Sequence, residues 1–191
     1  MDSDRVWAVT DSQRADLADL LDGLNDQQWM SPSLCEGWRV RDVAAHLTHS
    51  HMGLARIAAE AVRSAFRFDP MIRRLALEDS RTQPQIVAAL RAMVGSRRKV
   101  PGTSDRDPLM DVLVHGQDIA VPLGIARPMP VEAAVEVADH LWRMRFPMKP
   151  AERVKGTRLV ATDADFAVGQ GQELSAPIRD IVMILAGRQS P

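Results

Sequence analysis

DPLMDVLVHGQDIAVPLG, residues 107–124, is the segment from which the fold and the site of this chain are predicted. Asp107 suits the cap of a helix, and Pro108 suits the first turn, where its missing N–H has no partner to lose. Asp111 and His115 are four residues apart, so their side chains leave the same face of the helix. That face is otherwise apolar, and a carboxylate beside an imidazole on it costs free energy unless another group compensates them. A bound metal ion would do so; a buried ion pair between the two is the alternative.

The composition is typical of a globular protein. The chain has 191 residues, of which 46% are hydrophobic and 26% charged, enough for one domain of ordinary size with a full core. A formal net charge of −1 provides no field that attracts nucleic acid or an anionic membrane, so neither is an expected partner. The one cysteine, Cys35, excludes an internal disulfide. No signal peptide is recognisable, and no apolar run approaches the ~20 residues of a membrane span. We expect a cytoplasmic protein.

The spacing of apolar residues predicts a chain that is mostly helical. The predicted helices cover residues 4–24, 39–66, 82–95, 107–124 and 131–145, with a weaker one at 71–77 and a last one after Pro177. Loops are predicted at 25–37, where Pro32 and Gly37 interrupt the pattern, and at the basic run 97–99.

The C-terminal part of the chain has a different pattern. Residues 158–161 and 166–168 are predicted to form two short strands of a hairpin. The expected fold is therefore mainly α: a four-helix bundle over residues 1–147, followed by a small α+β appendage, hairpin plus helix, over residues 148–191.

A second histidine, His46, lies on the apolar stripe of the predicted helix 39–66. Counted from the predicted helix starts, His46 lies seven residues in, Asp111 four and His115 eight, and these depths differ by roughly one turn at ~1.5 Å per residue. In an up-down-up-down bundle alternate helices run parallel, so the three side chains would meet at one level. The count requires that 71–77 is not an independent bundle helix.

Two imidazoles and one carboxylate are enough ligands for a metal ion that keeps open positions for water and substrate. Zinc is the first expectation, and nickel, iron and manganese are also compatible with these ligand types.

Two further groups near these residues have more than one interpretation. Asp118, three residues after His115, either holds the imidazole in one tautomer as an outer partner or bonds the backbone or an arginine. Cys35 is most simply a small buried apolar residue, and a cysteine–histidine hydrolase is the alternative. His49 and His51 are interpreted as surface or rim residues. His51, five residues after His46, turns to another side of the helix, whereas His49, three residues after it, could share its edge and line the mouth of the pocket.

Two stretches, CEGWRVRDVAAHLTH at 35–49 and DVLVHGQDIAVPLG at 111–124, resemble the mycothiol-dependent maleylpyruvate isomerase family, part of the DinB-like metal-binding helical bundles. The tail RLVATDADFAVGQGQEL, from residue 158, is similar to the C-terminal piece of many members. The resemblance implies metal ligands at His46, Asp111 and His115, the residues that the depth count selects. The family commonly has glutamate where Asp111 stands.

The resemblance also implies mycothiol, a low-molecular-weight thiol, as cosubstrate beside the metal ion. A metal-bound thiol loses its proton at neutral pH and becomes a nucleophile. The expected function is therefore a thiol transferase or isomerase acting on a small electrophilic molecule, with its catalytic residues unassigned and a homodimer among the expected assemblies. Arg179 is a candidate for holding mycothiol.

Two other functions remain as alternatives. One is a non-enzymatic metal- or ligand-binding bundle of the same fold, for example a stress-response protein. The other is an iron oxygenase built on two histidines and one carboxylate, although such sites usually lie in a β-barrel.

Overall fold

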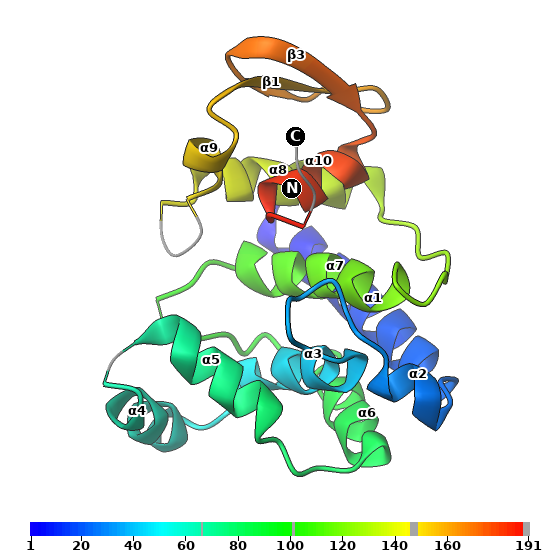
Figure 1. Ribbon diagram of the computed structural model, residues 1–191, viewed down its shortest axis with the longest axis vertical. Coiled ribbons are helices and arrows are strands. Elements are labelled where there is room, and N and C mark those ends of the chain that lie inside the picture. The colour runs from blue at the N-terminus through cyan, green and yellow to red at the C-terminus, as the bar shows by residue number, and fades with distance from the viewer. Residues whose placement is uncertain (66, 101, 146–148, 189–191) are drawn as a thin grey trace. The chain divides into compact units, whose positions relative to one another are not determined.

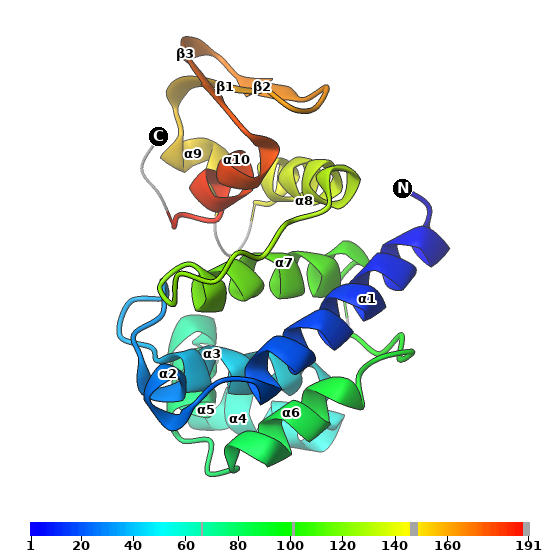
Figure 2. The same ribbon diagram turned by 90° about the vertical axis from the view of Figure 1, so that its right-hand side faces the viewer.

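The computed structural model describes residues 1–65, 67–100, 102–145 and 149–188. The chain forms two compact units, one of Trp7–Ala126 and one that joins Met1–Val6 to Arg127–Pro191. Both are drawn in Figures 1 and 2. Among the described residues, every helix is too short or too polar to cross a membrane.

The Trp7–Ala126 unit is helical, as expected. In chain order its elements are the larger part of α1 (Ser3–Asp22), α2 (Asp26–Met30), α3 (Val40–Leu47), the 3-10 turn η1 (Thr48–His51), α4 (Leu54–Arg63), α5 (Phe68–Leu77), α6 (Gln83–Arg91) and α7 (Arg106–Ala120). α3 lies beside α7 (Figure 1). The core contains Leu17 and Leu21 of α1, Val43 of α3, Leu90 of α6 and Val112 of α7. Burying these side chains holds together segments that lie far apart in the sequence.

The prediction of one continuous helix over residues 39–66 is wrong. α3 ends at Leu47, the chain passes through η1, and α4 begins only after Gly53. The hydroxyls of Thr48 and Ser50 bond back to the carbonyl oxygens of Ala45 and Leu47, at 2.7 and 3.4 Å. Such bonds compete with the helical ladder, and the glycine that follows favours a break.

The segment 71–77 belongs to a separate helix, α5, which starts at Phe68. The comparison of how far His46, Asp111 and His115 lie along their helices required that 71–77 is not an independent helix, and the structure does not meet this requirement. Whether His46 and His115 meet therefore depends on how α3 packs against α7, and not on the up-down order of helices along the bundle.

Two further differences from the predictions concern the start of α7 and a short helix within a predicted loop. α7 begins at Arg106, so Asp107 is already inside the helix, where its Oδ2 accepts the backbone N–H of Ser104 at 2.6 Å. The predicted loop 25–37 contains the short helix α2, which a reciprocal pair of hydrogen bonds between Asn25 and Gln28 starts. Such a capping box satisfies free amides at a helix N-terminus.

The other unit combines helices with a small sheet. It contains α8 (Val131–Arg143), α9 (Pro150–Arg153), β1 (Gly156–Ala161), β2 (Ala167–Gly169), β3 (Gly171–Ala176) and α10 (Ile178–Leu185). β1 and β2 form the predicted antiparallel hairpin, and the sheet order is β2-β1-β3. α10 packs against α8 and β1 with an almost fully buried apolar face. The N-terminal amine of Met1 bonds Glu136 of α8 at 2.6 Å.

The third strand, β3, was not predicted. It runs parallel to β1, with Leu159 opposite Leu174. The chain reverses between β2 and β3 at Gly169 and Gly171, whose φ angles are 84° and 122°. A Cβ at Gly171 would collide with the carbonyl oxygen of Gly156 on the neighbouring strand, so only glycine allows this close reversal.

The start of α3 depends on Asp42, whose carboxylate is fully buried. Its Oδ2 accepts the backbone N–H and the Nε–H of Arg39, both at 2.9 Å, and its Oδ1 accepts from Nη2 at 2.9 Å. We expect Asp42→Ala to lower the free energy of unfolding by about 1–3 kcal/mol, because a helix cap and a charge-assisted bond are lost.

Urea denaturation of the variant tests this prediction. Asp16→Ala is the matched control, since Asp16 is exposed on α1 and a surface change of this kind costs less than about 0.5 kcal/mol. An Asp42→Ala midpoint equal to that of the control would contradict the capping role.

Candidate functional site

Two histidines from neighbouring helices meet inside the Trp7–Ala126 unit. The rings of His46 on α3 and His115 on α7 lie edge to face, with 4.9 Å between their centroids and 86° between their planes. The centroid of the Trp38 indole lies 5.4 Å from that of the His46 ring. The structure therefore brings together the two imidazoles that the sequence singled out, although the packing that does so differs from the one predicted.

His115 is held by a carboxylate on its own helix. Its Nδ1 lies 2.8 Å from Oδ2 of Asp118, which is completely buried. A carboxylate can only accept, so Nδ1 carries the shared proton and Nε2 is the second nitrogen of the ring. The spacing of three residues along α7 explains the contact, since such positions are neighbours on a helix surface.

Cys35 contributes to the same cluster. Its Sγ donates to Oδ2 of Asp118 at 3.1 Å and lies 3.9 Å from Nδ1 of His115. Cys35 is half-buried and packs against the hydrophobic core, as its interpretation as a small apolar residue implies, and its thiol is also hydrogen-bonded. No spacing in the sequence indicates this contact, because 83 residues separate Cys35 from Asp118.

The cluster has the composition of a metal-binding site. Among the described residues, a donor atom from each of Cys35, His115 and Asp118 lies within 4.8 Å of the others. Thiolate sulfur, imidazole nitrogen and carboxylate oxygen are all ligands that zinc accepts in proteins. The structure therefore offers a second donor set that shares His115 with the predicted one.

The cluster changes the proton affinity of His115. Burial acts to lower the pKa of His115, but the hydrogen bond to Asp118 and the contact with Cys35 outweigh it and raise the pKa to about 10. The negative charge of Asp118 stabilises the imidazolium, which is why the shift is upward. His115 therefore holds a proton at neutral pH when no metal ion competes for it.

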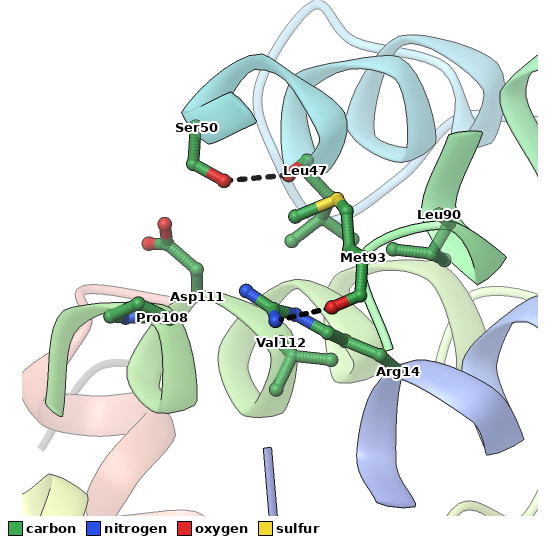
Figure 3. A pocket seen from close by; sticks show the side chains of 8 residues that line it. All are labelled: Arg14, Leu47, Ser50, Leu90, Met93, Pro108, Asp111 and Val112. Carbon is green, nitrogen blue, oxygen red and sulfur yellow. Dashed lines mark hydrogen bonds between the residues drawn. The ribbon is translucent and has the colours of Figure 1, made fainter. Parts of the chain in front are cut away.

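Asp111, the third predicted ligand, lines a small pocket on α7 (Figure 3). Its carboxylate extends into this pocket, which Arg14 of α1 and Ser50 of η1 also line. Arg14 is buried and donates to the carbonyl oxygens of Met93 and Ser96 at 3.0 and 3.2 Å. Burial lowers the pKa of Arg14, and the charge of Asp111 acts in the opposite direction. Asp111 thus has a cationic neighbour, and its membership of the ligand set stays a prediction.

Two further polar residues singled out by sequence, His49 and Arg179, belong to different units. His49 is half-buried and not on the open surface; its Nε2 lies 3.1 Å from Oδ2 of Asp79, and burial is the main cause that lowers the pKa of His49. Arg179 lies in the first turn of α10, in the other unit, and pairs with Asp180 at 3.0 Å. Its contact with a thiol cosubstrate stays a prediction.

The Trp7–Ala126 unit is a DinB-like helical bundle, and two of its neighbouring helices carry the histidine pair and the supporting carboxylate. The sequence profile of the mycothiol maleylpyruvate isomerase N-terminal domain matches residues 10–105. The chain belongs to this family. The matched segment includes Cys35 and His46 and ends before α7, so it does not cover His115.

Solved structures support the fold over the whole chain. Two crystal structures of the mycothiol-dependent maleylpyruvate isomerase, one of them a histidine-to-alanine mutant, are similar to it with TM-scores of 0.67 for the mutant and 0.60 for the other. Each is 15% identical, and each comparison covers 100% of this chain and 91% of the other. At this identity the likeness establishes the fold alone. No curated protein matches the sequence.

Proposed function

We propose that this protein is a divalent-metal-dependent enzyme that uses mycothiol to transfer a thiol to, or isomerise, a small electrophilic molecule. The observation that carries the proposal is the His46–His115 pair, 4.9 Å apart, with His115 fixed by Asp118. Family membership supports mycothiol as the cosubstrate, because the matching family is described as the N-terminal domain of mycothiol maleylpyruvate isomerase.

The donor set fits a divalent ion of the zinc type. Imidazole nitrogens suit zinc, nickel and iron, and a carboxylate adds a harder oxygen ligand. We propose His46, Asp111 and His115 as the ligands, with zinc as the first candidate and manganese also compatible. Asp118 already accepts hydrogen bonds from Nδ1 of His115 and from Cys35. That arrangement is typical of an outer carboxylate that orients a metal-binding histidine through its far nitrogen.

The chain's own residues would prepare this site before any ligand arrives. Asp118 fixes the ring plane of His115 and directs its Nε2 away from the carboxylate. Trp38 packs on His46 and limits the rotation of that ring. Arg14 contributes positive charge near Asp111. When bound, the ion supplies a Lewis acid that lowers the pKa of a coordinated thiol.

Mycothiol is polar, and we propose Arg179 as one residue that holds it. We propose a small electrophile as the second substrate, and a panel of such molecules is the probe.

An activity assay tests the function. We expect the purified protein with mycothiol to consume electrophiles from the panel, and removal of the metal by a chelator to lower the rate at least about 100-fold, since metal activation supplies several kcal/mol. Adding zinc back should restore the rate. His46→Ala is expected to behave like the chelated protein, and His140→Ala, on α8, is the matched control. A metal-loaded protein that is inactive on the whole panel would favour the non-enzymatic alternative.

A further inference from the structure

The segment 31–38, between α2 and α3, contacts the surroundings of both histidines. Trp38 packs its ring against His46, and Cys35 bonds the carboxylate that holds His115. One short segment therefore touches two side chains that come from different helices. We call it the 31–38 loop.

The 31–38 loop is itself well ordered by hydrogen bonds. The hydroxyl of Ser33 donates to the carbonyl oxygen of Trp38 at 2.9 Å and accepts the backbone N–H of Cys35 at 3.1 Å. The backbone N–H of Leu34 donates to the carbonyl oxygen of Asp118 at 3.1 Å, which ties the loop to α7. The position of the Cys35 thiol relative to Asp118 is thus set by the backbone on both sides.

The thiol and the imidazole donate to the same oxygen. Oδ2 of Asp118 accepts from Nδ1 of His115 at 2.8 Å and from Sγ of Cys35 at 3.1 Å. Asp118 is completely buried, so water does not readily replace a lost donor, and a buried carboxylate with fewer donors is costly. Two donors at fixed positions define the plane of the carboxylate better than one does.

We propose that Cys35 is a positioning residue, which holds Asp118 by a hydrogen bond and through it fixes the ring of His115 for metal binding. The effect on metal affinity rests on the function proposed above, whereas the effect on Asp118 and His115 does not. A thiol is a weak donor, so serine is expected to replace it and alanine is not.

The hydrogen bond can be tested without any metal ion. Cys35 is the chain's one cysteine, so the infrared S–H stretching band of the metal-free protein comes from this thiol alone. We expect Asp118→Asn to move the band to higher wavenumber, because a neutral amide oxygen is a weaker acceptor than a carboxylate. Asp16→Asn, at an exposed position on α1, should leave the band unchanged. A band that is the same in wild type and Asp118→Asn would overturn the proposal.

The effect on His115 is a second readout that needs no metal. The Nδ1 proton of His115 should exchange with water several-fold faster in metal-free Cys35→Ala than in wild type, and Cys35→Ser should restore slow exchange. Equal exchange in all three proteins would overturn the positioning role even if every protein folds normally. If the wild type binds no metal at all, the function proposed above fails while these two measurements still decide the role of Cys35.

Metal affinity is the third readout. We expect Cys35→Ala to bind zinc on the order of tenfold more weakly, in the range for loss of an outer partner, and Cys35→Ser to remain within about twofold of wild type. Cobalt(II) distinguishes positioning from direct ligation. A sulfur-to-cobalt charge-transfer band in the wild type without added thiol would show that Cys35 is itself a ligand and would overturn the proposal. The proposal is supported if this band is absent and if Cys35→Ala binds zinc more weakly than Cys35→Ser and wild type do.

Discussion

Replacing His115 with alanine is expected to remove the divalent metal from the protein. Wild type purified without added metal should carry close to one divalent ion per chain by elemental analysis, and His115→Ala should carry almost none. The reason is that His115 belongs to both donor sets that the structure offers, the predicted one with His46 and the compact one with Cys35 and Asp118. Its loss should cost more than the roughly 10–100-fold that loss of an outer partner costs.

The control for this prediction is His140→Ala, which removes an imidazole on α8, outside the cluster. Circular dichroism of both variants shows whether each remains folded. Two further variants separate the donor sets: His46→Ala should also lose the ion, while Cys35→Ser should keep it. Full occupancy in folded His115→Ala would rule out a metal centre at this histidine.

Metal binding is expected to strengthen about tenfold for each unit by which the pH rises between about 6.5 and 8.5, because one proton is displaced. The pKa of His115 in the metal-free protein is raised to about 10. His115 is therefore protonated across this whole range, and the ion must displace that proton to reach the ring nitrogen. The direction of the shift sets the sign: a raised pKa weakens metal binding at low pH.

Titration calorimetry in buffers of different ionisation enthalpy checks this directly. Near pH 8 we expect release of about one proton for each zinc ion bound. Asp118→Asn should release less at the same pH, because without the carboxylate the pKa of His115 is no longer raised in this way. Binding with no proton release in wild type would show that His115 is neutral before the ion arrives.

The same proton also acts on the stability of the metal-free protein. A raised pKa means that the folded state binds the proton more tightly than the unfolded state does. This contribution is fully present below the ordinary histidine pKa of 6.5 and is lost as the pH rises through about 10. Denaturation midpoints of the metal-free wild type should therefore fall over this interval more than those of His115→Ala.

Local sequence patterns predicted most of the helices and brought out part of the candidate site. The apolar stripes around His46 and His115 place both imidazoles on inward faces, and the structure packs their helices together. Asp118 lies against His115 because residues three apart are neighbours on the surface of one helix, which is a local property. The hairpin of β1 and β2 was likewise evident from residues that are close in sequence.

Contacts between distant residues were decided only by the tertiary structure. Cys35 reaches Asp118 across 83 positions, and β3 pairs in parallel with β1 after a reversal at Gly169 and Gly171. The break after Leu47 and the separate helix α5 also differ from the predicted bundle, in which alternate helices were expected to run parallel.

The physical reason for this division is the range of the interactions involved. Helix periodicity, capping and turn formation depend on residues that are close in sequence, so they can be predicted directly from the local sequence. Which loop packs against which helix depends on burying surface over the whole chain, and many arrangements share the same local pattern. The residues proposed to bind a metal ion could therefore be singled out along the chain. The contact of the Cys35 thiol with Asp118 depends on the packing of the 31–38 loop against α7, which only the tertiary structure shows.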